Sequence, residues 1–199
     1  MIGGRRRTPA RLLCAGFLLV IVAATGCSTA RGEISGNSGV VRVGAAENFW
    51  GSVASQLGGK HAQVSSIITN PNTDPHSYEP TAADARTIAS ARLVIENGAG
   101  YDPWVSRLVA ADQGQQIAVL NVASALGVLA GGNPHRWYNP DDVRALVNML
   151  AARYSKLDPT DKNYFARRRA QFLKVGLGKY DDLIASIKDN YGGTPVGAP

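Results

Sequence analysis

The sequence predicts an α/β fold, in which a parallel four-stranded sheet is flanked by helices and followed by a long helix. Four short runs rich in apolar and β-branched residues alternate with segments of helical periodicity between residues 40 and 157. These runs do not alternate with polar residues, which indicates strands buried on both faces. Strands that alternate with helices in this way are typical of a parallel sheet with helices on both sides.

The first two strands each lead into a helix. Val40–Val43 is β-branched and is the first expected strand, and Val64–Thr69 is the second. Thr81 and Asp84 resemble a capping box at the start of the helix after the second strand. The helix after the first strand has apolar residues at helical spacing, namely Trp50, Val53, Ala54 and Leu57.

The second half of this region repeats the order of strand and helix. Leu93–Ile95 and Ile117–Leu120 are the third and fourth expected strands. Asn97–Gly100 leaves the third strand as a turn, and Asp102–Pro103 then opens a helix. Asn139–Pro140 opens another helix in the same manner, because Asn is a good N-cap and proline is favoured at the first helical position.

Residues 158–191 are predicted to form one long helix of roughly 50 Å at 1.5 Å per residue. Gly176 and Gly178 each weaken that helix by about 1 kcal/mol. The helix is longer than one small lobe needs, so part of its apolar stripe is expected to be exposed. The stripe consists of Phe165, Phe172, Leu173, Leu177, Tyr180, Ile184, Ile187 and Tyr191.

The N-terminal residues 1–26 have the pattern of a lipoprotein signal peptide. Basic residues precede the apolar run Leu12–Ala24, which is too short for a typical membrane span. Small residues then lead to Cys27, where we expect cleavage and lipidation; an ordinary signal peptide with an incidental cysteine is the alternative. Residues 27–39 are rich in Gly and Ser and are expected to be a flexible tether. The protein is therefore expected to be exported and held by lipid at the outer face of the cytoplasmic membrane.

The net charge of +6 does not indicate nucleic-acid binding. Four of the 21 basic residues lie in the expected signal peptide, and without them 17 basic residues face 15 acidic ones, so the net charge falls to +2. The remaining cluster, Arg167–Arg169, is expected to be a solvated helix face. Nucleic-acid binding needs a clustered basic surface, which this sequence does not offer.

Two proline-rich loops each hold one histidine. His76 lies in the segment 70–80, after the second strand, and His135 lies in the segment 131–140, after the fourth. Each histidine follows a proline and precedes an aromatic residue and a further proline, which stiffens the loop. Because ligands bind beyond the carboxyl ends of parallel strands, both loops are expected to open on one rim. A neutral imidazole is a good zinc ligand, so His76 and His135 are the predicted metal ligands.

Four ordered motifs resemble the zinc- or manganese-binding lipoproteins of ABC transporters, a family of periplasmic solute-binding proteins. They are Ala45–Gly51, Asp74–Pro80, Val94–Asp102 and Asn133–Pro140, and the resemblance extends over about residues 40–191. Asn133 and Asn139 stand where the family often has Asp.

The resemblance implies two α/β lobes joined by a long helix, with the ion between the lobes. It assigns residues 40–157 to the N-terminal metal-binding lobe, 158–191 to the linking helix and 192–199 to the start of a second lobe that the sequence lacks. The implied ligand is zinc or manganese, carried to an ABC permease in the membrane. In the family the second lobe adds ligands, among them a carboxylate, so the sequence leaves the choice between the two ions open.

Other residues near the loops have weaker assignments. Glu47 could bind the ion or the loops, but a carboxylate at a helix start is the commoner explanation. Asp74 is expected to shape the turn or accept a bond from an imidazole N–H. Trp137 and Tyr138 are expected to wall the cleft, and His61, at the other end of the sheet, is expected to be an ordinary surface residue.

The leading interpretation is therefore a metal-binding lipoprotein that breaks no bond. A truncated or split product, active only with a separate second-lobe chain or inactive, is the alternative, because an uncovered apolar helix face would suit a partner. A zinc-dependent hydrolase is the third interpretation. It is disfavoured because the sequence has neither an H-E-x-x-H motif nor a G-x-S-x-G elbow.

Overall fold

The computed structural model describes residues 39–111, 116–129 and 131–195. The expected signal peptide, Cys27 and nearly all of the expected tether lie outside these described residues. Those three assignments therefore stay predictions.

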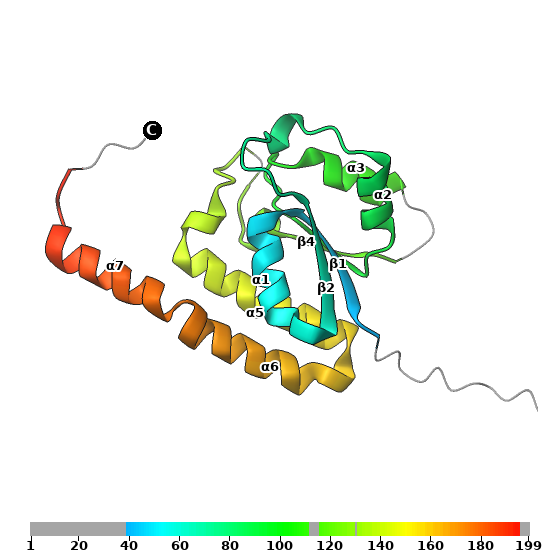
Figure 1. Cartoon of the computed structure of the whole chain (residues 1–199). Helices are drawn as coiled ribbons and strands as arrows, with labels where there is room; N and C mark the ends of the chain where they lie inside the picture. Colours follow the sequence, from blue (N-terminus) through cyan, green and yellow to red (C-terminus); the bar gives the residue numbers. More distant parts are fainter. Residues whose placement is uncertain (1–38, 112–115, 130, 196–199) are drawn as a thin grey trace, which may run out of the picture. The chain divides into compact units, whose positions relative to one another are not determined.

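The core of the protein is a parallel sheet of four strands in the order β2-β1-β3-β4 (Figure 1). The strands are β1 Val41–Glu47, β2 Ala62–Ile68, β3 Leu93–Glu96 and β4 Ala118–Asn121. Val43 of β1 pairs with both Val64 and Leu93, so β1 lies at the centre of the sheet. The predicted α/β class with a parallel four-stranded sheet is confirmed. β1 is longer than expected and ends at Glu47.

Helices cover both faces of the sheet, as the continuous apolar strands predicted. The helices are α1 Asn48–Gly58, α2 Ala82–Ala89, α3 Pro103–Ala111, α4 Val122–Ala125, α5 Pro140–Leu157, α6 Lys162–Gln171 and α7 Gly178–Tyr191. Trp50 of α1, Leu150 of α5 and Phe165 of α6 are buried together on one face. Ile88 of α2 and Trp104 of α3 belong to a second core on the other face.

The predicted helix starts at Thr81 and Asn139 are present with their hydrogen bonds. The Thr81 side chain accepts from the backbone N–H of Asp84, and the Asp84 carboxylate accepts from the backbone N–H of Thr81, which completes the capping box. The Asn139 side chain accepts from the backbone N–H of Asp141, and Pro140 occupies the first position of α5.

The long C-terminal helix is present, but it is not one regular α-helix. A short 3₁₀ turn, η4 Pro159–Asp161, precedes α6, and a π turn, η5 Phe172–Gly176, separates α6 from α7. In the π turn the backbone N–H of Leu177 donates to the carbonyl of Phe172, five residues earlier. Gly176 is the last residue of this turn and Gly178 is the first residue of α7, so both glycines that were expected to weaken the helix lie at the interruption.

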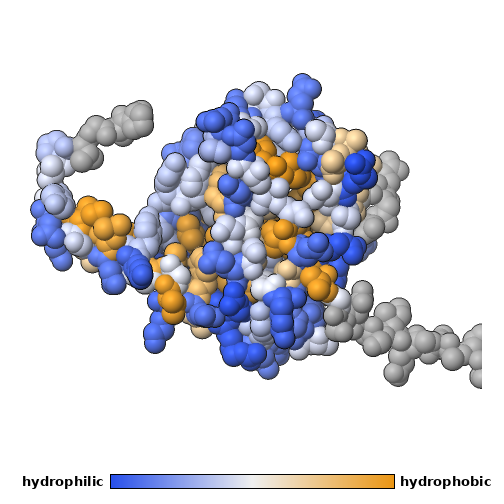
Figure 2. All heavy atoms as spheres, viewed as in Figure 1, coloured by the Kyte–Doolittle hydropathy of each residue, from blue (hydrophilic) through white to orange (hydrophobic). Residues whose placement is uncertain are grey.

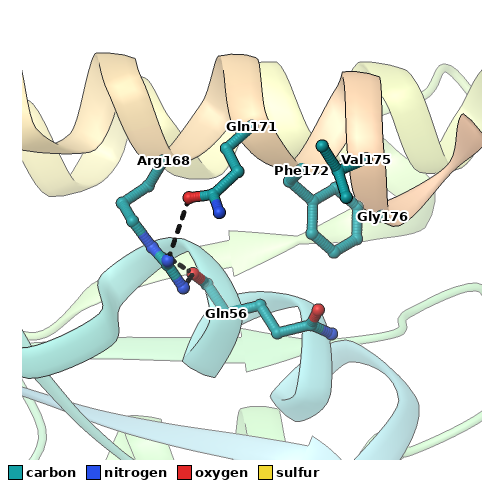
Figure 3. Close-up of a pocket in the computed structure, with 6 residues that line it drawn as sticks. All are labelled: Gln56, Arg168, Gln171, Phe172, Val175 and Gly176. Atoms are coloured by element: carbon teal, nitrogen blue, oxygen red, sulfur yellow. Dashed lines mark hydrogen bonds between the residues drawn. The ribbon is translucent and has the colours of Figure 1, made fainter.

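α6 is fastened to the core, whereas α7 is not buried in it. Arg168 of α6 donates to the backbone carbonyl of Gln56 at the end of α1 (Figure 3), and Phe165 stacks on Tyr154 with ring centroids 5.1 Å apart. α7 has no buried residue, and Figure 2 shows hydrophobic surface on it. The exposed apolar side chains of α7 are Tyr180, Leu183, Ile184, Ile187 and Tyr191.

In the part of the chain that the structure describes, no helix combines the length and the apolar character needed to span a bilayer.

Candidate metal site

The loop after β2 holds His76 in a short 3₁₀ turn, η2 Pro75–Ser77. Asp74 precedes the turn, and its Oδ1 accepts from the backbone N–H of His76 at 3.0 Å. The same oxygen lies 3.0 Å from His76 Nδ1, and Oδ2 accepts from the hydroxyl of Ser77. These hydrogen bonds lower the pKa of Asp74, and the bond from the imidazole has the largest effect. The turn therefore presents an imidazole whose orientation is set by the residue two positions before it.

The tautomer of His76 follows from these contacts. An ionised carboxylate can only accept, so Nδ1 must carry the proton that faces Asp74. Within the described residues no hydrogen bond engages Nε2 of His76, and the side chain is 52% exposed. A neutral imidazole in this tautomer offers Nε2 as a metal ligand, supported by a carboxylate on the other nitrogen.

The loop after β4 repeats this geometry around His135, with an amide in place of the carboxylate. Asn133 Oδ1 accepts from the backbone N–H of His135 at 2.9 Å and lies 2.8 Å from His135 Nδ1. The backbone bond identifies this atom as the amide oxygen, so Nδ1 of His135 is also the protonated nitrogen. His135 is exposed and precedes the 3₁₀ turn η3 Arg136–Tyr138. Both loops therefore direct Nδ1 inward to the loop and leave Nε2 for a ligand.

Tyr101 connects the two histidines. Its ring centroid lies 4.9 Å from that of His76 and 5.8 Å from that of His135. The loop between β3 and α3 places it there by a turn with three successive left-handed residues, Gly98, Ala99 and Gly100, with φ of 77°, 52° and 82°. Strands β2, β3 and β4 thus each contribute one ring to the same rim of the sheet, as the rule for parallel strands predicts.

A hydrogen-bond network under the rim joins the His135 loop to the core. The buried Asn97 accepts from the indole N–H of Trp50 at 2.8 Å and donates to the carbonyl of Pro134 at 3.0 Å. Asp102 accepts from the backbone N–H groups of Asn97 and Gly98, at 2.6 and 2.8 Å. Because Pro134 directly precedes His135, this network holds the His135 loop against the loop between β3 and α3.

Glu47 does not act as the helix cap that its position suggested. It precedes α1, yet its side chain makes no capping hydrogen bond, is only 1% exposed and has no hydrogen-bond partner on either oxygen within the described residues. Burial, followed by the nearby carboxyls of Asp102 and Glu96, raises its pKa to about 9. Burial also raises the pKa of Asp102 to about 6. Glu47 is therefore a neutral acid at neutral pH, and favourable interaction of a carboxylate with the α1 dipole is the wrong explanation for it.

The aromatic residues after His135 differ in their packing. Trp137 is partly buried and stacks on Phe49, with ring centroids 4.1 Å apart, whereas Tyr138 is 73% exposed. A cavity of about 190 Å³ lies beside the rings, and its lining includes Glu47, Tyr101 and Trp137. Trp137 therefore lines this cavity, and Tyr138 lines a neighbouring apolar groove with Phe172 and Tyr180.

The predicted ligands do not form a complete metal site in the described residues. A metal site needs at least three ligand atoms close together, and no three His, Cys, Asp or Glu side chains around His76 and His135 place theirs within 4.8 Å of one another. Such a group exists elsewhere among the described residues, at His61, Asp158 and Asp161. His61 is partly buried and its Nδ1 lies 2.7 Å from Oδ2 of Asp161, so the expectation of an ordinary surface residue was wrong.

Sequence reasoning missed two residues of this rim, Tyr101 and Asn97. Both lie in the segment Val94–Asp102, which the sequence had marked as one of the four ordered motifs, but neither residue was assigned a role at the site. Its position after a predicted strand was the available signal, because loops at the carboxyl ends of parallel strands share one rim.

Comparison with known proteins places these features in a family. A family model described as zinc-uptake complex component A, periplasmic, matches residues 43–196. The manganese ABC transporter substrate-binding lipoprotein PsaA of Streptococcus mitis is 27% identical over 193 residues, which cover 90% of this chain and 60% of that protein. The manganese-binding lipoprotein MntA of Halalkalibacterium halodurans is 22% identical over 169 residues, which cover 81% of this chain and 55% of that protein.

Solved structures show the same fold. The solute-binding protein FpvC of Pseudomonas aeruginosa, in complex with Ni²⁺, superposes with a TM-score of 0.66 at 26% identity, over 79% of this chain and 57% of that one. The Zn(II)-bound ZnuA-like domain of Streptococcus pneumoniae AdcA superposes with a TM-score of 0.61 at 22% identity, over 77% and 55%. The chain spans between 55 and 60% of the length of the curated relatives named above.

Proposed function

The chain belongs to the periplasmic zinc-uptake component A family, and from this we propose that it binds one divalent metal ion, zinc or manganese, through His76 and His135. The observation that carries the proposal is the matched pair of loops. In each, the residue two positions before the histidine engages Nδ1 and leaves Nε2 for a ligand, and both rings contact Tyr101. Two side chains prepared in the same way at one rim suit a shared ion.

In this proposal the described residues supply half of the coordination. Zinc sites in proteins usually have three or four protein ligands, and two exposed imidazoles meet only part of that need. The remaining ligands, a carboxylate among them, come from a second lobe that belongs to the same protein or to a separate chain. Imidazole favours zinc and oxygen ligands favour manganese, so the ligands of that lobe decide between the two ions.

The wider role follows from the family. We propose an exported solute-binding protein, anchored by lipid on Cys27 at the outer face of the membrane, that delivers its ion to an ABC permease. It forms and breaks no covalent bond in the ion's transfer. The relatives named as lipoproteins of metal ABC transporters support this assignment.

Calorimetric titration of the full chain with zinc and with manganese tests the proposal. His76→Ala and His135→Ala should each weaken binding of the same ion by at least about tenfold, because each removes one ligand. Glu79→Gln, an exposed residue of the same loop, is the matched control and should leave binding unchanged. Binding that neither histidine affects would refute the site. Zinc-dependent hydrolytic turnover would instead favour the hydrolase interpretation.

A further inference from the structure

His61, Asp158 and Asp161 meet at the end of the sheet opposite the two histidine loops. His61 ends the 3₁₀ turn η1 Gly59–His61 between α1 and β2, and the two aspartates lie at the junction of α5 and α6. A bond from the backbone N–H of Lys60 to the hydroxyl of Tyr164 joins the same two regions. β2 has seven residues, so its length separates this cluster from the His76 loop by roughly 20 Å.

The three side chains place their potential metal-ligand atoms close together. Each offers one ligand atom, and these atoms lie within 4.8 Å of one another. Nδ1 of His61 is 2.7 Å from Oδ2 of Asp161. The His61 ring also packs against Tyr164 and Phe165, with centroids 4.4 and 6.1 Å away, which limits its rotation.

The burial of the Asp158 carboxylate also indicates a cation site. It is only 4% exposed, and one of its oxygens accepts from the hydroxyl of Thr160 at 2.6 Å. Among the residues that the structure describes, no Lys, Arg or His nitrogen forms an ion pair with its carboxylate. A bound cation would supply the countercharge that this carboxylate lacks among the described residues.

The donor set suits a borderline metal such as zinc. One imidazole nitrogen and two carboxylate oxygens are ligand types that zinc binds, and water would fill the fourth position. Ligand atoms around tetrahedral zinc lie about 3.4 Å apart, given bonds of about 2.0–2.2 Å. The ion would therefore take the place of the present close contact between His61 Nδ1 and Asp161 Oδ2 and draw Asp158 closer by side-chain rotation. The side chains of His61 and Asp161 are 21% and 28% exposed, which leaves a path for a hydrated ion.

We propose that His61, Asp158 and Asp161 form a second divalent-cation site, of the zinc class, that fastens the α1–β2 turn to the start of α6. The site lies away from His76 and His135 and does not depend on them. Its role is structural: it connects the sheet to the helix that continues into α7.

The test uses the full chain with both His76→Ala and His135→Ala, so that any remaining zinc binding is independent of the proposed function. Equilibrium dialysis should find one zinc ion, and added zinc should raise the unfolding temperature. His61→Gln in this background should weaken binding by at least about tenfold and abolish the zinc-dependent rise, because an amide is a poor zinc ligand.

A thiolate offers a complementary test, since His61→Cys should retain zinc binding. If the His61→Gln chain does not fold, Asp161→Asn, on a partly exposed residue, replaces it with the same expected loss. The proposal is wrong if the double-alanine chain binds no zinc. It is also wrong if adding His61→Gln or Asp161→Asn leaves the zinc affinity of that chain unchanged. In either case the cluster is only a polar contact between the α1–β2 turn and the start of α6.

Discussion

Glu47 allows a sharp test of how the rim is built. Its pKa of about 9 in the folded protein, against an ordinary value of 4.5, means that the folded state retains a proton that the unfolded state releases between those two values. The stability of the protein should therefore fall as pH rises from 4.5 to 9, by up to about 1.4 kcal/mol per pH unit. At pH 7 the accumulated cost is about 3 kcal/mol.

Glu47→Gln keeps the shape of the side chain and removes the titration. The buried amide has its own cost of about 1–3 kcal/mol if it finds no partner, but that cost does not depend on pH. The decisive quantity is thus the difference in unfolding free energy between the two proteins, measured by urea denaturation at several pH values from 5 to 9. This difference should shift steadily in favour of the glutamine variant as pH rises.

The reasoning is refuted if that difference is constant over this range, because Glu47 would then be charged in the folded protein. Glu79→Gln is the control: its side chain is exposed, so its effect should stay within about 0.5 kcal/mol at every pH. Asp102, whose pKa is raised to about 6, adds a similar slope to both proteins below pH 6 and should cancel.

Three further changes test the loops and the core. Asn133→Asp should strengthen metal binding several-fold in calorimetry, because a carboxylate beside His135 Nδ1 makes Nε2 a better donor. Thr81→Ala should lower the unfolding free energy by about 1 kcal/mol through loss of the capping box, as measured by urea denaturation. Tyr154→Phe should lower it by about 1–2 kcal/mol, because the buried carbonyl of Ala54 loses its 2.9 Å hydrogen bond.

Each of these three predictions can be contradicted by a control substitution or by a specific result. Asp74→Asn makes the opposite change on the other loop and should weaken metal binding. If Asn133→Asp and Asp74→Asn changed the metal affinity in the same direction, the carboxylate would not tune the imidazole. Thr81→Ser should retain the cap, so a loss as large as that of alanine would contradict the capping explanation. For Tyr154→Phe, an unchanged unfolding free energy would show that the hydroxyl bond adds no net stability.

Local chemistry made much of the fold predictable. Short β-branched runs, the capping box at Thr81 and the N-cap at Asn139 act over a few residues, so each could be assigned without knowledge of distant contacts. The two histidine loops were predictable for the same reason, since Pro75 and Pro134 restrict the backbone beside each histidine.

The helix at the C-terminal end was predictable only in part. Its apolar stripe indicated the length correctly, and two glycines indicated weakness. The π turn at Phe172–Gly176 depends on how α6 packs, with Phe165 buried and Arg168 bonded to α1, whereas α7 has no buried residue. A periodic pattern cannot reveal where such packing ends.

The sequence by itself determined the class of fold, the strand and helix starts, and the pair of loops that carry His76 and His135, because these depend on neighbours within a few residues. Only the tertiary structure decided the strand order, the position of Tyr101 between the two loops and the burial of Glu47. It also brought His61 to Asp158 and Asp161, about a hundred residues later in the chain. Desolvation and contacts between distant segments are properties of the packed protein, and they arise only when the strands and helices come together.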